Sequence, residues 1–122
     1  MYNYLEAVKN DVIQAIEDNY NLEEYRDNRQ ELEEKLNNDL WTDDSVTGNA
    51  SGSYTFNTYK AEENLSHNWD LLKEAADAFG IEATISDSYE RGPEYWDVTI
   101  RCYLLGQAIA AVLDDLEADD KI

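Results

Sequence analysis

The sequence predicts an α+β protein of about four helices packed on a small two- or three-stranded antiparallel sheet. Several segments repeat apolar residues every three or four positions, which is the spacing of an amphipathic helix. Residues 95–102 instead alternate strictly between two faces, which is the spacing of a half-buried strand. A chain of 122 residues with 43% hydrophobic content has room for one core. We therefore expect a single domain over residues 1–122.

Two helices are predicted first, over about residues 3–20 and 21–41. In the second helix, Asn21 is the expected N-cap, and Glu24 three residues later completes a capping box. Both segments show one continuous apolar stripe. The stripes consist of Leu5, Val8, Val12 and Ile16 in the first helix and of Tyr25, Leu32, Leu36 and Leu40 in the second.

Residues 43–57 break the helical pattern with several turn-forming residues, and Tyr54 and Phe56 then alternate with polar neighbours. We expect a turn-rich connection followed by a short strand. A third helix then begins at about residue 57 or 58 and runs to Phe79. It ends at Gly80, because glycine readily adopts the left-handed conformation that follows many helices.

The last third of the chain predicts two strands and a final helix. Residues 81–86 form the first strand, and a loop over residues 87–94 contains the single proline, Pro93. Residues 95–102 form the clearer strand, with Trp96 and Ile100 on its buried face. The final helix covers about Tyr103 to Leu116. Because a two-stranded sheet is marginal alone, it must rest on the helices.

Charge and composition exclude several classes of protein. The chain has 28 acidic and 9 basic residues, a net charge of −19 and a pI near 4.1. Such a chain repels phosphate, so we expect no direct binding to nucleic acid or to an anionic membrane. No apolar run approaches the ~20 residues of a membrane span, and the start lacks a signal peptide. These features predict a cytoplasmic protein, in the bacterial host cytosol if a phage encodes it.

Residues that would carry chemistry are few. His67 is the single histidine, and Cys102, the single cysteine, falls on the apolar face of a predicted strand. No phosphate-binding glycine loop, nucleophile elbow or HExxH motif is present. Residues 43–54 match part of an EF-hand loop, with Gly48 at the sixth place, but Tyr54 stands where the bidentate glutamate belongs. We therefore expect no catalytic residue, no cofactor and no metal site.

The acidic residues are arranged along predicted helix faces, opposite the apolar stripes and with few compensating bases. Solubility is served by a net charge of magnitude ~2–8 in a small domain, and this chain goes well beyond that. Acids at the end of the last helix also oppose the helix dipole. This excess predicts a basic partner. The candidate contact residues are Glu24, Asp27, Glu31 and Glu34 in the second helix, Glu63, Asp70, Glu74 and Asp77 in the third, and Asp114 and Asp115 in the last.

The small size, the acidity, the lack of catalytic residues and the stretch GNASGSYTFNTYKAEENLSHNWDLL resemble small proteins of phages and mobile elements of gut Firmicutes. This group includes anti-CRISPR and anti-restriction proteins. The resemblance implies a stoichiometric inhibitor whose acidic helix faces fill the DNA or RNA groove of a nucleic-acid-binding enzyme, such as a Cas effector nuclease.

Three other interpretations remain open from the residues. The chain could be an interaction module without mimicry, for example a homodimer that pairs a free β edge. It could be a small enzyme or a calcium-binding protein. Its acids could also serve solubility alone.

Overall fold

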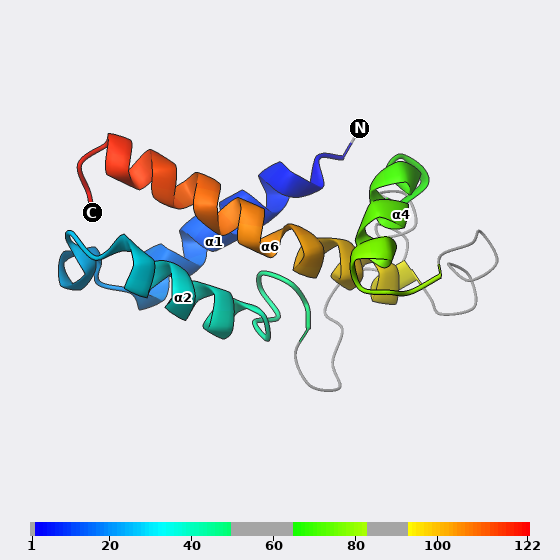
Figure 1. Ribbon diagram of the computed structural model, residues 1–122, viewed down its shortest axis with the longest axis horizontal. Helices are drawn as coiled ribbons and strands as arrows, with labels where there is room; N and C mark the ends of the chain where they lie inside the picture. The colour runs from blue at the N-terminus through cyan, green and yellow to red at the C-terminus, as the bar shows by residue number, and fades with distance from the viewer. Residues whose placement is uncertain (1, 50–64, 83–92) are drawn as a thin grey trace.

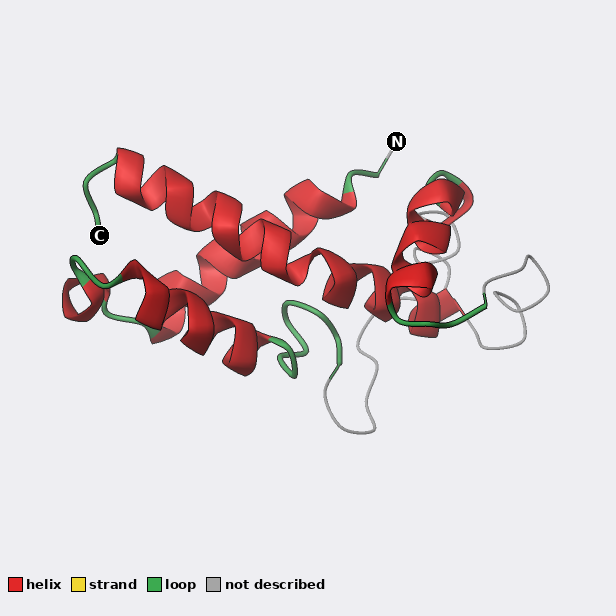
Figure 2. Ribbon diagram, in the orientation of Figure 1, coloured by secondary structure: helices red, strands yellow, loops and turns green. Residues whose placement is uncertain are grey.

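The computed structural model describes residues 2–49, 65–82 and 93–122, and the regular elements in these residues are all helices, joined by loops (Figure 2). No strand occurs in this part of the chain, so the predicted α+β class is wrong and the described fold is all-α. The four α-helices and one 3₁₀ helix are α1 (Tyr4–Asn19), η1 (Leu22–Tyr25), α2 (Arg29–Leu40), α4 (Trp69–Ala78) and α6 (Pro93–Ala118).

Helix α6 is 26 residues long and runs through the length of the molecule (Figure 1). It contacts α1, α2 and α4. Residues 95–102, predicted as a strand, form its first turns, and the predicted helix from Tyr103 continues without a break. Pro93 stands at the first helical position, where its missing N–H costs no hydrogen bond.

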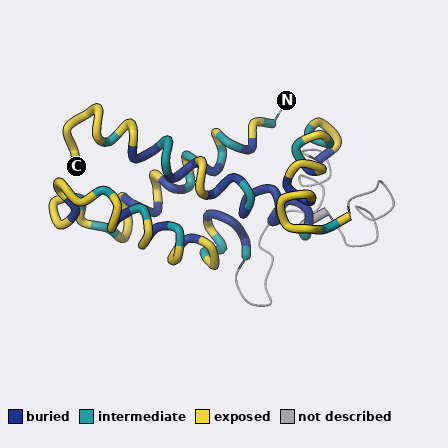
Figure 3. The backbone as a smooth tube through the Cα atoms, viewed as in Figure 1, coloured by how far each residue is buried: buried dark blue, intermediate teal, exposed yellow. Residues whose placement is uncertain are grey.

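The strand prediction failed because this part of α6 is buried on every side. All residues from Trp96 to Cys102 are buried, polar ones included (Figure 3). A helix buried all round has no solvent face, so it lacks the 3.6-residue periodicity on which the prediction relied. The polar residues find partners inside the molecule instead: the Thr99 hydroxyl, for example, donates to the Tyr95 carbonyl oxygen at 2.8 Å.

The first predicted helix is confirmed and the second is wrong in its first part. Asn3 caps α1, its side-chain oxygen accepting from the Glu6 N–H at 3.0 Å. The region from residue 21 is instead divided into η1 and α2, separated by Asp27 with a φ of 62°. Asn21 does act as an N-cap, but of η1, where its side chain accepts from the Glu23 N–H at 3.2 Å.

The end of the third predicted helix is confirmed, but its continuity is wrong, because the chain leaves the helix at residues 67–68 before α4 begins at Trp69. Gly80 follows α4 with a φ of 70°, and its N–H donates to the Asp77 carbonyl at 3.1 Å. The next N–H, of Ile81, donates to the Ala76 carbonyl at 2.8 Å, which completes a Schellman motif. The predicted helix start at residues 57–58, the strand at Tyr54–Phe56 and most of the strand over 81–86 lie outside the described residues.

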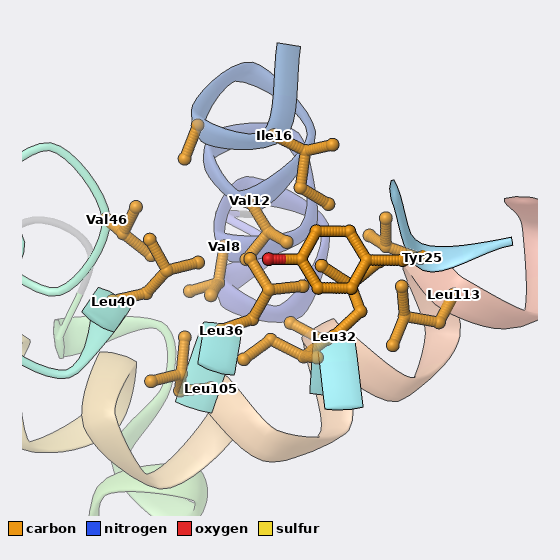
Figure 4. Packing of buried hydrophobic residues seen from close by; sticks show 14 residues of the cluster. Val8, Val12, Ile16, Tyr25, Leu32, Leu36, Leu40, Val46, Leu105 and Leu113 are labelled. Carbon is orange, nitrogen blue, oxygen red and sulfur yellow. The ribbon is translucent and has the colours of Figure 1, made fainter. Parts of the chain in front are cut away.

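Two apolar clusters make up the described core, one at each end of α6. The first joins α1, α2 and α6, and its side chains point toward one another in Figure 4. Val46, from the loop after α2, closes this cluster. The second joins the start of α1, α4 and the first half of α6 around Trp96. Its other buried members are Tyr4, Leu65, Leu72, Ala75, Ala76, Ile100 and Leu104.

By length and composition alone, Tyr95–Ala118 is apolar enough to cross a membrane. This corrects the expectation that no apolar run approaches that length. However, 72% of the most apolar 18-residue window is buried inside the molecule. Such burial is what the central helix of a helical core shows, so the match is weak evidence for a membrane span.

Candidate protein-binding surface

The predicted contact residues that the structure describes all lie on the molecular surface. On α4, Asp70, Glu74 and Asp77 share one exposed face, on the side opposite the buried Leu72 and Ala75. Their spacing of four and three residues keeps them aligned along the helix. We call these three residues the α4 acidic face. Glu63, the fourth acid predicted for this face, lies outside the described residues.

The four acids predicted for one face of the second helix do not share a helix. Glu24 lies in η1, Asp27 lies in the left-handed turn, and only Glu31 and Glu34 belong to α2. The helical-wheel argument assumed one uninterrupted helix, so the alignment of all four acids is wrong. Glu31 also accepts a hydrogen bond from the Asn28 side chain at 2.5 Å.

The acids at the end of α6 are partly neutralised by arginine. Arg29 forms ion pairs with Glu117, with Asp114 at 2.7 Å and with Glu33 at 3.7 Å. Hydrogen bonds to Glu117 and Asp114 raise the pKa of Arg29. Arg26 lies 3.8 Å from Asp120 in the same region. Packing of α2 on α6 brings Arg29 to these carboxylates.

Most other described bases also have internal partners, namely Lys9 with Glu6, Lys35 with Asp39 and Arg101 with Asp97 and Asp11. Lys73 lies over the Trp69 ring at 5.9 Å. Within the described ranges, Asp114 is therefore the one predicted contact residue with an ion pair. The carboxylates without one are Glu24, Asp27, Glu31, Glu34, Asp70, Glu74, Asp77 and Asp115.

A groove of about 420 Å³ borders the α4 acidic face, between the start of α1, α4 and α6. Glu74 lines it together with Tyr103 and Gln107 from α6. Partial burial raises the pKa of Tyr103. The Tyr103 hydroxyl donates a hydrogen bond to the Glu74 carboxylate, which raises the pKa of Tyr103 further. Sequence reasoning did not find this groove. The one available signal was the number of tyrosines, nine in the chain, which is more than a small core holds.

Exposed aromatic side chains continue from the groove. Trp41 and Phe79 are 39% and 41% exposed, and their rings meet edge to face with centroids 6.1 Å apart. The Phe79 ring meets that of Tyr103 in the same way at 6.4 Å. We call these three residues the aromatic row. Exposed tryptophan and tyrosine are enriched where proteins contact one another.

A buried polar network lies behind the groove. Arg101 donates to the Tyr2 hydroxyl at 2.6 Å and to Asp11 at 3.0 Å, and its Nε lies 3.4 Å from Asp97. The Tyr4 hydroxyl donates to Asp97. Burial raises the pKa of Tyr4, and the Asp97 charge raises it further. One guanidinium between two carboxylates holds the start of α1 against α6 and leaves a formal charge of −1.

The remaining reactive groups have ordinary surroundings. Burial raises the pKa of the Cys102 thiol to about 11, which keeps it protonated and unreactive at neutral pH. The Asp43 carboxylate, at the start of the EF-hand-like stretch, accepts from the N–H and hydroxyl of Ser45 at 2.8 and 2.6 Å. Within the described residues, no group of three or more His, Cys, Asp or Glu side chains could hold a metal ion.

Comparison with protein-family models, curated proteins and solved structures finds no match to this chain. Function must therefore be argued from the charges, burial and contacts of its own residues.

Proposed function

We propose that this protein is a stoichiometric inhibitor that binds a basic nucleic-acid-binding protein and occupies the groove where that protein holds DNA or RNA. One observation carries the proposal: the α4 acidic face is exposed and forms no ion pair with any described base. The described bases are mostly engaged elsewhere, so this excess of negative charge is open to a partner.

The regular spacing of the α4 acidic face supports mimicry of a phosphate backbone. With a rise of ~1.5 Å per residue, Asp70, Glu74 and Asp77 recur every ~4.5–6 Å along the helix axis. Phosphates along one strand of duplex DNA recur every ~3.4 Å along its axis. Carboxylates at such spacing can replace phosphates at lysine and arginine contacts, where charge-assisted hydrogen bonds are strong. Attraction over long range would speed association and make it sensitive to salt.

The other predicted acids take lesser roles in this proposal. Glu24 and Asp27 are separated from Glu31 and Glu34 by the break between η1 and α2, so they offer no regular row. Asp114 is already held by Arg29, and a partner's base would have to compete for it. Asp115, which has no ion pair among the described residues, extends the negative surface toward the end of α6.

The class of target comes from the resemblance to anti-CRISPR and anti-restriction proteins. A Cas effector nuclease holds its guide–target duplex in a positively charged channel that recognises backbone shape rather than sequence. An acidic helix face suits such a channel. Inhibition would then need no catalytic residue, no cofactor and no metal, and it would take place in the cytosol where the enzyme works.

The test begins with capture of partners by the purified protein from a lysate containing CRISPR effectors and restriction enzymes. We expect one nucleic-acid enzyme to be retained at low salt and released by high salt or by its own DNA or guide RNA. The triple variant Asp70→Asn/Glu74→Gln/Asp77→Asn should lose this partner and its inhibition of DNA cleavage.

A matched control removes the same charge elsewhere. Glu17, Asp18 and Asp119 are exposed acids without an ion pair among the described residues. The variant Glu17→Gln/Asp18→Asn/Asp119→Asn should keep binding and inhibition. If both triple variants behave alike, net charge rather than the α4 acidic face is responsible. Unchanged inhibition by the α4 variant would reject the proposal.

A second candidate function is a homodimeric interaction module without mimicry. The aromatic row favours it, because Trp41 and Phe79 are exposed beside each other. Pairing through a free β edge is not retained, since the described residues contain no strand. Sedimentation distinguishes the two functions. A dimer that persists at high salt and is lost in the variant Trp41→Ala/Phe79→Ala supports the homodimeric module. A monomer at all protein concentrations rejects the module and is consistent with the inhibitor.

A further inference from the structure

The groove beside the α4 acidic face combines apolar walls with a single negative charge. Leu5, Leu71 and Leu104 supply apolar surface from three different helices. Glu74 contributes the one carboxylate among the lining residues, and no lysine or arginine lines the groove. Such a lining suits a long side chain with an apolar stem and a cationic head.

The groups behind the groove do not cancel this negative charge. Arg101 reaches the Tyr2 hydroxyl at the groove's lining, but its side chain is 7% exposed and is flanked by Asp11 and Asp97. The three charges sum to −1. Of the neighbouring acids on α4, Asp70 and Asp77 are exposed and form no ion pair with a described base. The potential at the groove is therefore negative from several directions.

The geometry points to a binding site for an arginine side chain of the protein partner. The Glu74 carboxylate accepts from the Tyr103 hydroxyl, and its remaining acceptor positions can take hydrogen bonds from a guanidinium. The carboxamide oxygen of Gln107 offers a further acceptor. The Tyr103 ring lines the same groove and supplies an aromatic face on which a planar guanidinium stacks.

Arginine fits this lining better than lysine for two reasons. An ammonium group is a compact, strongly hydrated charge, whereas a guanidinium is planar and more weakly hydrated. Burying an arginine head against Tyr103 and Glu74 therefore costs less solvation free energy than burying a lysine head. The volume of about 420 Å³ leaves space for the whole side chain, with its stem along the leucines.

This inference rests on the proposed function for the identity of the partner, a basic nucleic-acid-binding protein. Arginine contacts to phosphate are common in such proteins. An arginine that normally holds a phosphate would enter the groove and meet Glu74 in its place. The α4 acidic face would supply attraction over distance, and the groove would fix the register of the complex.

The experiment titrates the 122-residue chain with blocked pentapeptides Gly-Gly-X-Gly-Gly, in which X is arginine, lysine or citrulline. Citrulline has nearly the shape of arginine without its charge. Binding is followed by ¹H–¹⁵N NMR. With arginine we expect shifts centred on the amides of Leu71, Tyr103 and Gln107 and weak affinity, on the order of millimolar, because one side chain makes few contacts. Lysine should bind at least about threefold more weakly, and citrulline should cause no shifts at these amides.

Three single variants test the groove, and the first two separate it from diffuse attraction. Glu74→Gln removes the lining carboxylate and should weaken arginine binding about tenfold. Asp77→Asn removes one charge from the same helix but does not line the groove, so its effect should stay below about twofold. Tyr103→Leu keeps an apolar wall without the aromatic ring and should abolish the preference for arginine over lysine. Circular dichroism of each variant checks that the helices are intact.

The inference is overturned if the three peptides give equal shifts, if the shifts lie away from the groove, or if Asp77→Asn weakens binding as much as Glu74→Gln. These outcomes are independent of any nuclease. If the groove binds the arginine peptide but the protein inhibits no nucleic-acid enzyme, the proposed function is rejected and the arginine site is supported. If the protein inhibits such an enzyme but the groove does not bind the peptide, the arginine site is rejected and the proposed function is supported.

Discussion

The two ends of the molecule contain the same components at different depths. We call the region around α4 and the start of α6 the α4 end, and the region around α2 and the last turns of α6 the α2 end (Figure 1). Each end has an apolar cluster, an arginine between two or more carboxylates and a hydrogen bond from a tyrosine to an aspartate. Each also has a helix that finishes with a left-handed residue.

The difference between the two arginines shows what depth does to the same chemistry. The side chain of Arg101 at the α4 end is 7% exposed, whereas that of Arg29 at the α2 end is 29% exposed. Water screens the second and barely reaches the first. A buried charge that loses its partner is costly, while an exposed one is re-solvated. The α4 end should therefore depend on its polar network, and the α2 end should depend mainly on its apolar cluster.

The largest effect should come from removing the buried arginine. Arg101→Met leaves the side chain of Asp97, which is 3% exposed, without its cation. We expect a loss of about 3–5 kcal/mol in the free energy of unfolding, measured by urea denaturation. Arg29→Met should cost less than about 1 kcal/mol, and high salt should reduce that cost further. Adding Asp97→Asn to Arg101→Met should recover part of the loss. Equal costs for the two arginines would erase the contrast between the ends.

The next effect concerns the tyrosine–aspartate pairs. Tyr4 donates to the buried Asp97, while Tyr20 donates at 2.6 Å to Asp39, whose side chain is 45% exposed. Tyr4→Phe should cost about 1–3 kcal/mol of unfolding free energy because it removes a donor from a buried carboxylate. Tyr20→Phe should cost less than about 1 kcal/mol, because water replaces the lost donor. A larger loss for Tyr20→Phe would contradict the ranking.

The two left-handed helix ends should respond in opposite directions to substitution. Gly80 has a φ of 70° and nothing within 4 Å of an added Cβ, so Gly80→Ala should cost about 1–2 kcal/mol from backbone strain alone. At the α2 end, Asp120 has a φ of 57°. Asp120→Gly should raise stability by less than about 1 kcal/mol, because glycine relieves the strain at some cost in entropy. Thermal unfolding of both variants tests the pair, and a destabilised Asp120→Gly would mean that its carboxylate contributes more than the strain costs.

The smallest effect is a pH dependence at the α2 end. The hydrogen bond from Tyr20 lowers the pKa of Asp39, with a smaller contribution from Lys35. A lowered folded pKa stabilises the protein above the unfolded pKa of ~3.9, and the contribution is lost as pH falls through the folded value. Asp39→Asn should therefore be destabilising at pH 7, and its difference from wild type should shrink as the pH falls below the unfolded pKa and disappear once the pH lies below the folded pKa. A difference that persists there would show that Asp39 acts other than through its charge.

The parts of the fold that the sequence predicted are those with a local cause. Helix α1 has an apolar stripe and an asparagine cap, and the left-handed turn after α4 has a glycine. The failures have tertiary causes. Asp97 and Arg101 are polar residues that form hydrogen bonds or ion pairs inside the core. Their alternation with apolar neighbours produced the two-residue periodicity of a strand, although the segment is helical. The break at Asp27 involves neither glycine nor proline, and its one local signal is that aspartate tolerates the left-handed conformation, which is weak within a continuous apolar stripe.

The candidate site divides in the same way. The alignment of Asp70, Glu74 and Asp77 follows from their spacing on one helix and could be predicted. The pairing of Arg29 with Asp114 joins residues 85 positions apart, so it depended on how α2 packs on α6. The groove at Tyr103 lies among three helices and has no sequence motif of its own.

If the protein is the inhibitor proposed above, the length of α6 sets the footprint that it can present to its target. Its 26 residues span ~39 Å at ~1.5 Å per residue, which is about the length of eleven base pairs at ~3.4 Å each. Because one continuous helix joins Tyr103, beside Glu74, to Asp114 eleven residues later, the acids of the two ends are held at a fixed separation of ~17 Å along its axis, about half a turn of duplex. A channel that grips at least half a turn could engage both ends at once, whereas one that grips only a few nucleotides could engage a single end.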